Sequence, residues 1–442
     1  MAEAFSDQRR IESETIRKVG IRLVPFLVVC YFIAYVDRVN VGFAALTMNK
    51  DLGLTATAFG TGAALFFVAY VIFEVPSNLA LERFGARRWI ARIMISWGLV
   101  GLGSAFVTGA VTFSIARFLL GAAEAGFFPG VILYLTYWFP KAYRARIVAM
   151  FMVAIPVSSF LGSPLSAALL TLDGVGGLRG WQWLLICESI PALLLGLATL
   201  VVLPSRPAEA QFLTSEQKAW LEGCLEAERR AASAGHSGHG SVWSVLTNKQ
   251  VWLLAVIYSG SSATSNALSL WMPQILKSFG LSNLETGLLN MIPFGIASVF
   301  MIFWGLRADK SGERIWSTAL PLALTSLSLA LTLLTGSLAL TLVLLSLVLL
   351  GNYSIKGPFF ALVTETLSPA QAAAGIAAIN TLAHLGTGAI TSLIGVLREQ
   401  SGSFPVALLP LSVQTAVGCS LVFWIGRDRM RASVAVAPAP AR

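Results

Sequence analysis

Charged residues are scarce in this chain. They make up 12% of its 442 residues, whereas soluble domains carry about 25%. Hydrophobic residues make up 56%, and the mean hydropathy is +0.75. This composition excludes a globular enzyme with a single membrane anchor. The net charge of +9 does not indicate nucleic-acid binding, because the basic residues form short clusters between apolar runs, as they do beside membrane helices.

Catalytic and cofactor motifs are also lacking. The sequence contains no Gly-x-x-x-x-Gly-Lys-[Ser/Thr] phosphate loop, which argues against a pump with its own ATP site. Its four cysteines, of which Cys224 lies in a polar loop, have the spacing of neither a zinc site nor a disulfide framework. The polar segments are too short for a catalytic domain. We therefore expect no metal, no cofactor and no enzymatic activity.

Long apolar runs fill most of the chain. A helix that spans a bilayer needs about 20 mostly apolar residues, and the N-terminus has no apolar core of a signal peptide that would be removed. These patterns predict an all-α membrane protein with twelve transmembrane helices. The spans lie near residues 20–46, 57–80, 90–108, 112–136, 147–171, 183–203, 250–276, 284–306, 316–335, 338–362, 373–397 and 404–426.

The longest polar break predicts two six-helix bundles. We expect a tail at 1–19, a bundle at 20–203, a linker at 204–249, a second bundle at 250–426 and a tail at 427–442. The linker contains His236 and His239 in a Gly/Ser-rich stretch. No Cys or acid completes a ligand set there, so we interpret this stretch as a flexible linker and not as a metal site.

Lysine and arginine are unevenly distributed between the loops. The odd-numbered loops carry only Lys50, Arg179, Lys277 and Arg398, and the remaining basic clusters fall in the even-numbered loops and the tails. Cytoplasmic segments of membrane proteins carry the excess of positive charge. This bias predicts that both termini and the linker are cytoplasmic.

Two short loops repeat one pattern: acid, base, any residue, Gly, any residue, Arg. They follow the second and the eighth span, which are equivalent positions in the two halves. We expect a duplicated transporter core with a substrate site between the halves, in which the Gly permits a tight turn and the acid holds arginines. The residues are Glu82, Arg83, Gly85 and Arg87 in the first loop, and Asp309, Lys310, Gly312 and Arg314 in the second.

Few ionisable residues fall within the spans. A charge at bilayer depth is costly unless it is paired or hydrated, and it often marks a transport path. Each could also be a static pair or a side chain that snorkels to the interface, and for Glu74 and Glu188 we leave this open. The set is Asp37, Arg38, Glu74, Arg117, Glu124, Glu188 and Lys356.

Asp37 and Glu124 are the predicted proton-coupling acids. Asp37 lies 15 residues after Arg22, or about 22 Å along a helix, and Glu124 lies near the middle of the fourth span. Arg117 precedes Glu124 by two turns and shares its face, so it is expected to tune that carboxyl. A carboxyl between desolvation and a nearby positive charge can bind and release a proton.

Arg38 is the predicted anion anchor. Its planar guanidinium can bind a carboxylate with two parallel hydrogen bonds. Tyr35 and Asn40 lie close in the sequence as further hydrogen-bonding groups, and Tyr70 in the second span adds a hydroxyl.

Lys356 is the corresponding cation of the second half. Gly357 and Pro358 follow it and are expected to break the helix there. A cation beside partly exposed backbone suits an anionic ligand, and the alternative is that Lys356 snorkels to the cytoplasmic face.

Polar residues also form a stripe on the seventh span. The stripe is either the wall of a hydrated cavity, which we favour, or a seam of hydrogen bonds between helices. Asn380 and His384, four residues apart in the eleventh span, form a similar pair. The stripe consists of Ser259, Ser262, Ser265, Asn266 and Ser269.

Four stretches of the sequence match the pattern of a known family: residues 35–44 (YVDRVNVGFA), 73–78 (FEVPSN), 117–130 (RFLLGAAEAGFFPG) and 271–275 (WMPQI). Through these motifs the chain resembles the major facilitator superfamily and, within it, the anion:cation symporters that import organic acids. The resemblance implies proton symport by alternating access, with Asp37 and Glu124 as coupling acids and Arg38, Tyr35, Tyr70 and Asn380 as substrate groups. Known relatives carry tartrate, phthalate, hydroxyphenylacetate or galactonate.

The sequence departs from the family pattern at several positions. Phe360 stands where the family often has Trp, His384 where it often has Asn, and Asn78 where the loop motif usually begins with Gly. Lys356 is not general in the family. These departures concern the substrate and leave the fold unaffected.

We therefore expect a proton-driven importer of a small organic carboxylate in a bacterial inner membrane. The predicted substrate-binding set also includes Lys356, Asn266, Phe360 and His384. The proton is the coupling ion, the partners are the substrate and the lipid bilayer, and a single copy is expected to suffice. The alternatives are a proton-independent facilitator or exchanger, and a non-transporting membrane sensor on the same fold.

Overall fold

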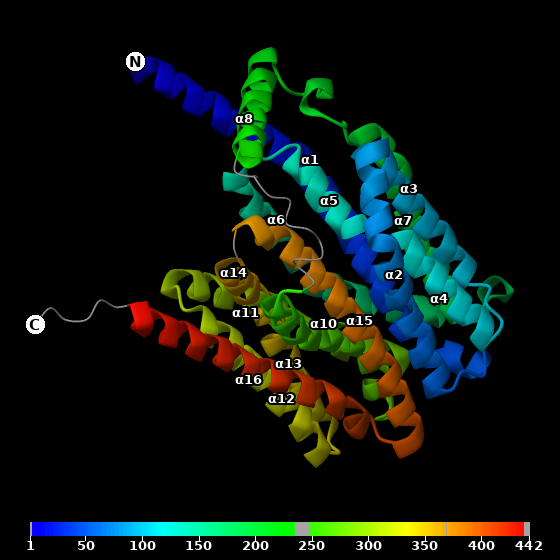
Figure 1. Ribbon diagram of the computed structural model, residues 1–442. Helices are drawn as coiled ribbons and strands as arrows, with labels where there is room; N and C mark the ends of the chain where they lie inside the picture. Colours follow the sequence, from blue (N-terminus) through cyan, green and yellow to red (C-terminus); the bar gives the residue numbers. More distant parts are fainter. Residues whose placement is uncertain (1, 235–246, 368, 437–442) are drawn as a thin grey trace, which may run out of the picture. The chain divides into compact units, whose positions relative to one another are not determined.

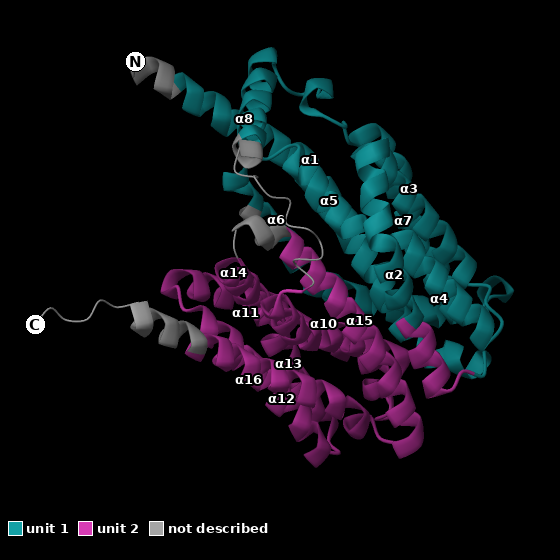
Figure 2. Ribbon diagram, in the orientation of Figure 1, with its two compact units in different colours: residues 1–53, 65–239 teal, residues 54–64, 240–442 magenta. Residues whose placement is uncertain are grey.

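The computed structural model describes residues 2–234, 247–367 and 369–436 (Figure 1). Every regular element in these ranges is a helix, which confirms the all-α prediction. The chain forms two compact units (Figure 2). Unit 1 consists of residues 1–53 and 65–239, and unit 2 of residues 54–64 and 240–442. Residues 54–64 include the beginning of the second helix, so that helix contributes to both units.

The helices of unit 1 follow the predicted order of spans, with the fourth span divided in two. They are α1 (Ala2–Asp51), α2 (Ala56–Phe84), α3 (Ala86–Ser104), α4 (Ala110–Glu124), α5 (Phe127–Thr136), α6 (Lys141–Leu169), α7 (Gly180–Val202) and α8 (Ser215–Ala234), with short 3₁₀ turns η1 (Leu170–Leu172), η2 (Val175–Gly177) and η3 (Pro207–Glu209).

Unit 2 repeats this order, and its tenth span is also divided. Its helices are α10 (Lys249–Lys277), α11 (Asn283–Ser311), α12 (Arg314–Leu331), the 3₁₀ turn η4 (Thr332–Leu334), α13 (Leu338–Ser354), α14 (Lys356–Thr366), α15 (Pro369–Ser401) and α16 (Phe404–Val436).

Ten helical stretches in the described residues are long and apolar enough to cross a bilayer. The remaining two of the twelve predicted spans correspond to α3 and α10. Three arginines in the first half of α3 and the polar stripe of α10 make these two helices less apolar than the others.

Several equivalent helices pair in the same way in the two units. In unit 1, α3 packs against α7 and α4, and α1 packs against α6 and α7. In unit 2, α12 packs against α16 and α13, and α10 packs against α15 and α16. The third, fourth and sixth spans of each half therefore share one arrangement, as do the first, fifth and sixth. This repetition extends the sequence repeat from two loops to the packing of each bundle.

The break between α4 and α5 was not predicted, because the sequence was interpreted as one span at 112–136. The chain leaves the helix at Ala125 (φ −54°, ψ 132°), and Gly126 adopts the left-handed region at φ 85°. A Cβ on Gly126 would lie 2.4 Å from Ser77 Oγ, so a larger residue would meet both backbone strain and α2. The break comes directly after Glu124.

The expected break in the tenth span is confirmed. Helix α13 ends at Ser354 and α14 begins at Lys356. Pro358 has no backbone N–H to donate to the carbonyl of Ser354, four residues earlier, which explains why the helical pattern is interrupted there.

Two polar segments are more ordered than predicted. The tail 1–19 continues α1 as a helix from Ala2, and residues 215–234 of the linker form α8, so the loop assignment of Cys224 was wrong. Leu221 and Leu225 are four residues apart and buried, which gives α8 an apolar face. Its other contacts include an ion pair between Arg144 and Glu228 at 2.9 Å. His236 and His239 lie outside the described residues.

Candidate functional site

Arg38 lies on α1 inside a cage of aromatic rings. Its guanidinium carbon is 5.0 Å from the ring centre of Tyr35, 5.5 Å from that of Phe66 and 5.4 Å from that of Tyr70. These distances are within the range of cation–π attraction, which is stronger where water is excluded. The predicted partners Tyr35 and Tyr70 are therefore beside Arg38, but they present ring faces to it.

Glu124 forms the ion pair with Arg38. Arg38 Nε donates to Glu124 Oε1 at 2.6 Å, and Arg38 Nη2 contacts the same oxygen. The Glu124 side chain is 2% exposed and that of Arg38 15%. The second oxygen, Oε2, has no hydrogen-bond partner among the described residues. The predicted anion anchor is thus bound to one of the predicted proton-coupling acids.

Arg117, which was expected to tune Glu124 by proximity, lies near it without an ion pair between them in the described residues. Its guanidinium carbon lies 4.9 Å from the ring centre of Phe66, and its Nε has no hydrogen-bond partner within the described part of the chain. The residue is buried and close enough to interact electrostatically with Asp37 and Glu124. Arg38 of α1 forms the ion pair with Glu124 of α4 instead. The spacing of residues along one helix cannot show such a contact between two helices.

Asp37 points away from Arg38 into a network of hydrogen bonds. Its Oδ1 accepts from Asn40 Nδ2 at 2.8 Å and its Oδ2 accepts from Trp97 Nε1 at 2.7 Å. Asn40 was expected beside Arg38, and this expectation was wrong. It lies about one helical turn after Asp37 on α1 and donates to that carboxylate instead. Both donors are neutral, so Asp37 is solvated by the protein without a direct ion pair.

A small cavity of about 20 Å³ joins Asp37, Asn40 and Arg117. Leu185 of α7 and Gly101 of α3 also line it. A single buried water needs about 10–15 Å³ and two to four polar partners. The cavity meets both conditions and therefore suits one water between the carboxylate of Asp37 and the guanidinium of Arg117.

Lys356 is buried at the start of α14 in unit 2, with 6% of its surface exposed. Its Nζ lies 4.6 Å from the ring centre of Tyr353. No carboxylate forms an ion pair with it in the described ranges. The snorkelling alternative does not fit this burial. A buried cation whose neighbour is an aromatic face can bind an anionic group.

At three of its five positions the polar stripe of α10 is a seam between helices, which contradicts the favoured cavity interpretation there. Ser265 Oγ accepts from Asn352 Nδ2 of α13 at 2.6 Å, and Ser262 Oγ accepts from Thr387 Oγ1 of α15 at 2.9 Å. Ser259 Oγ accepts from Gln414 of α16 at 2.8 Å. Three neighbouring helices are thus bonded to one face of α10.

The remaining predicted groups of unit 2 are partly buried. Asn266 donates to the Ser262 carbonyl of its own helix at 2.8 Å. Phe360 packs against Tyr258 and Phe359, with ring centres 5.2 and 5.5 Å apart. Asn380 and His384 lie one turn apart on α15. The substrate contacts of these four residues stay predictions.

The repeated loops share their turn but differ in their bonds. Gly85 and Gly312 both adopt positive φ, at 86° and 67°, which confirms the tight turns. In unit 2, Arg314 pairs with Asp309 at 3.1 Å and with Glu365 of α14 at 3.1 Å. In unit 1, the guanidinium of Arg87 donates to the Leu200 carbonyl of α7. Arg83 and Lys310 complete the pattern without such a bond in the described residues.

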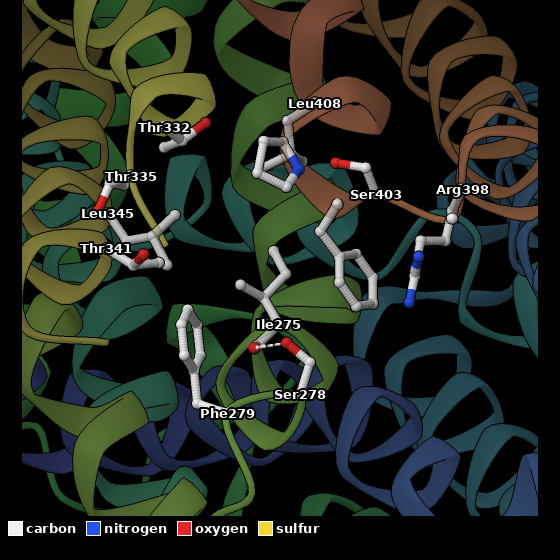
Figure 3. A pocket seen from close by; sticks show the side chains of 13 residues that line it. Ile275, Ser278, Phe279, Thr332, Thr335, Thr341, Leu345, Arg398, Ser403 and Leu408 are labelled. Carbon is white, nitrogen blue, oxygen red and sulfur yellow. Dashed lines mark hydrogen bonds between the residues drawn. The ribbon is translucent and has the colours of Figure 1, made fainter. Parts of the chain in front are cut away.

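A larger pocket of about 270 Å³ lies in unit 2 (Figure 3). Thr341 and Leu345 place it beside the first turns of α13, at the opposite end of that helix from Lys356, and Arg398 lines its other side. It contains none of the predicted substrate groups, so we do not assign it to the substrate. No group of three or more His, Cys, Asp or Glu in the described residues is arranged to hold a metal ion.

Sequence reasoning missed two features of unit 1. One is the helix break directly after Glu124, although Gly126 and Pro129 were visible signals. The other is the burial of Glu188 beside Asn40 and Asp37, for which the sequence offers no local signal because the residues come from α7 and α1.

The chain matches the model of the Major Facilitator Superfamily over residues 27–391. It is 45% identical to a protein of Agrobacterium vitis named "Putative tartrate transporter", over 96% of this chain and 93% of that protein. It is 38% identical to a quinolone resistance transporter of Acinetobacter baumannii, over 93% and 95% of the two chains. The crystal structure of a bacterial homolog to the human lysosomal transporter Spinster is similar in fold, with a TM-score of 0.76, 13% identity and coverage of 95% and 98%.

Proposed function

The chain belongs to the Major Facilitator Superfamily, and from this premise we propose that it imports a small organic carboxylate together with protons by alternating access. It is a multi-pass membrane protein, and we place it in a bacterial inner membrane.

The ion pair between Arg38 and Glu124 carries this proposal. Both side chains are largely buried, and the guanidinium is surrounded by three rings. A substrate carboxylate that binds Arg38 competes with the Glu124 carboxylate for the guanidinium. A protonated Glu124 has no negative charge and releases the guanidinium more easily. Proton binding at Glu124 and substrate binding at Arg38 are therefore favourable together.

This competition couples the two ligands in a defined order. On the periplasmic side, a proton binds Glu124 and the substrate carboxylate binds Arg38. On the cytoplasmic side, Glu124 loses its proton and binds Arg38 again, which displaces the substrate. Asp37 and Arg117 lie close enough to adjust this exchange electrostatically. Arg38 is therefore paired either with Glu124 or with the substrate, since an unpaired buried charge is unfavourable.

The substrate class rests on the cations of the two units and on the relatives. The Agrobacterium vitis protein is named for tartrate, a small acid with two carboxylates. Lys356 supplies unit 2 with a buried cation of its own. Each unit thus has a buried cation that can bind a carboxylate, and we favour dicarboxylates over monocarboxylates.

Purified protein in proteoliposomes tests the proposal. A pH gradient, acidic outside, should drive accumulation of tartrate or a similar acid in the wild type. Glu124→Gln should abolish accumulation while exchange of labelled for unlabelled substrate persists, because the neutral amide leaves Arg38 available but binds no proton. The matched control Glu222→Gln removes an exposed carboxylate of α8 and should behave as the wild type.

The alternatives give different results. A proton-independent facilitator or exchanger would show equal uptake with and without the gradient, and Glu124→Gln would leave it unchanged. A sensor without transport would show neither uptake nor exchange while still binding the acid in a thermal-shift assay. The same assay, with a panel of mono- and dicarboxylates and a quinolone, identifies the ligand class.

A further inference from the structure

Glu188 is a third acid in the interior of unit 1. It lies on α7, is 3% exposed, and its Oε1 accepts from Ser166 Oγ of α6 at 2.7 Å. Its Oε2 is buried without a hydrogen-bond partner in the part of the chain that the structure describes. The exchange of proton and substrate at Glu124 and Arg38 does not use this residue.

In the described part of the chain, no basic side chain lies within ion-pair distance of Glu188. The charged group that faces it is Asp37 of α1, and the adjacent Cys187 belongs to its own helix. An ionised carboxyl in such a place is very unfavourable, and a group of this kind binds a proton instead. A protonated carboxyl also carries an O–H donor, which a carboxylate lacks.

Asn40 connects Glu188 to the coupling network. Its amide donates to Asp37 Oδ1 at 2.8 Å, and the same side chain lies next to the Glu188 carboxyl. Gly101 of α3 keeps this region close-packed: a Cβ there would lie 2.3 Å from Ser189 Oγ and 3.9 Å from Asp37 Oδ1. The two carboxyls therefore face one neutral side chain in a region that excludes bulk solvent.

The position of Glu188 along the bundle indicates from which end it binds a proton. It follows the start of α7 at Gly180 by eight residues, or about 12 Å. Asp37 precedes the end of α1 at Asp51 by fourteen residues, or about 21 Å. These two helix ends lie together, since Trp181 Nε1 donates to Asp51 Oδ2 at 3.0 Å. Glu188 is thus nearer than Asp37 to the end that the basic residues predict to be periplasmic.

We propose that Glu188 is a further proton-binding site, which holds a proton in the interior of unit 1 and exchanges it with Asp37. This inference rests on the proposed symport for its role in transport, although proton binding itself does not depend on it. In the exchange, the O–H bond of Glu188 breaks and an O–H bond forms on Asp37. The negative charge moves to Glu188, which then binds another proton from the nearer end. Asn40, which lies next to both carboxyls, marks the place of this transfer.

Infrared spectroscopy of the full-length protein in lipid tests proton binding without transport. Wild type at neutral pH should show a protonated-carboxyl band that shifts in deuterium oxide. Glu188→Gln should remove this band, and the exposed control Glu222→Gln should retain it. An unchanged spectrum in Glu188→Gln would overturn the proposal. If Glu188→Gln does not fold, Ser166→Ala replaces it: loss of the hydrogen bond to Oε1 should shift the band, and an unshifted band contradicts the assignment.

Transport then tests the exchange with Asp37. Glu188→Gln should lose accumulation driven by a pH gradient while substrate exchange persists, and Asp37→Asn should shift the Glu188 band. Accumulation equal to the wild type, or loss of both activities in a folded variant, would show that Glu188 is a structural group. If the wild type itself does not respond to the gradient, the symport proposal fails, and the infrared band still decides whether Glu188 binds a proton.

Discussion

Unit 1 and unit 2 pair their helices in the same way but bury different chemistry. Unit 1 encloses Asp37, Arg38, Arg117, Glu124 and Glu188, whereas Lys356 is the buried charged residue among the described residues of unit 2. In place of acids, unit 2 has hydroxyls and amides that bond α10 to its neighbours. The duplicated architecture has thus kept the packing and changed the side chains that the packing encloses.

This difference separates two tasks. Buried acids and arginines are costly in a membrane interior and are retained where charge must move or be recognised. Neutral hydrogen bonds between helices stabilise a bundle without depending on pH. We infer that proton handling is concentrated in unit 1, and that unit 2 adds a stable frame and one cation. Substitutions in each unit test this division.

Arg38→Lys should have the largest effect on transport. Lysine keeps the positive charge but cannot bind a carboxylate with a planar pair of donors. The loss of one charge-assisted hydrogen bond costs about 1.5–3 kcal/mol, which corresponds to roughly 10- to 100-fold in affinity. Substrate affinity, measured from the concentration dependence of uptake, should fall by this factor. Unchanged affinity would show that Arg38 does not bind the substrate.

Gly121→Ala should destabilise unit 1 at the charged cluster. A Cβ on Gly121 would lie 2.2 Å from the backbone oxygen of Phe66, so α2 and α4 would have to move apart. Such overpacking costs about 1–3 kcal/mol and would displace the ring that faces Arg38. Thermal unfolding in detergent should occur at a lower temperature. The control Gly103→Ala, where nothing lies within 4 Å, should unfold as the wild type.

Lys356→Gln should affect dicarboxylates more than monocarboxylates. The glutamine retains a hydrogen-bond donor but removes the charge that a second carboxylate would bind. One lost charge-assisted bond predicts about a 10-fold weaker affinity for the dicarboxylate and little change for the monocarboxylate. Competition of both acids for uptake measures this ratio. Equal losses for the two acids would exclude Lys356 as the second anchor.

Thr387→Val should have the smallest effect. It removes the hydrogen bond from Thr387 Oγ1 to Ser262 Oγ and leaves the side-chain volume nearly unchanged. Hydrogen bonds between membrane helices contribute about 0.6 kcal/mol on average, so unfolding should shift slightly and proton-driven accumulation should not change. Thr364→Val is the control, because its exposed hydroxyl bonds only its own helix. Loss of proton-driven accumulation in Thr387→Val would contradict the division between the units.

Much of the fold could be predicted because the membrane restricts what a sequence can form. Apolar runs of sufficient length predicted the spans, and the repeated loops with Gly85 and Gly312 predicted the duplication and both turns. Local signals in the sequence were insufficient where a conformation depends on packing against another segment. The linker was interpreted as a loop although Leu221 and Leu225 bury one face of α8, and the helix break at Gly126 lies where Ser77 of α2 leaves no room for a Cβ.

For the site, the sequence identified the residues but not their partners. Asp37, Arg38, Glu124 and Lys356 stood out because a charge within an apolar run is improbable without a function. Two kinds of contact depend on distances between segments far apart in the chain: the ion pair of Arg38 with Glu124, and the bonds of Ser259, Ser262 and Ser265 to other helices. Composition and periodicity determined which chemistry this protein keeps inside the membrane. Which of these groups bond to one another depends on the tertiary structure. Hydrogen bonds and ion pairs act over a few ångströms, and only packing brings their atoms that close.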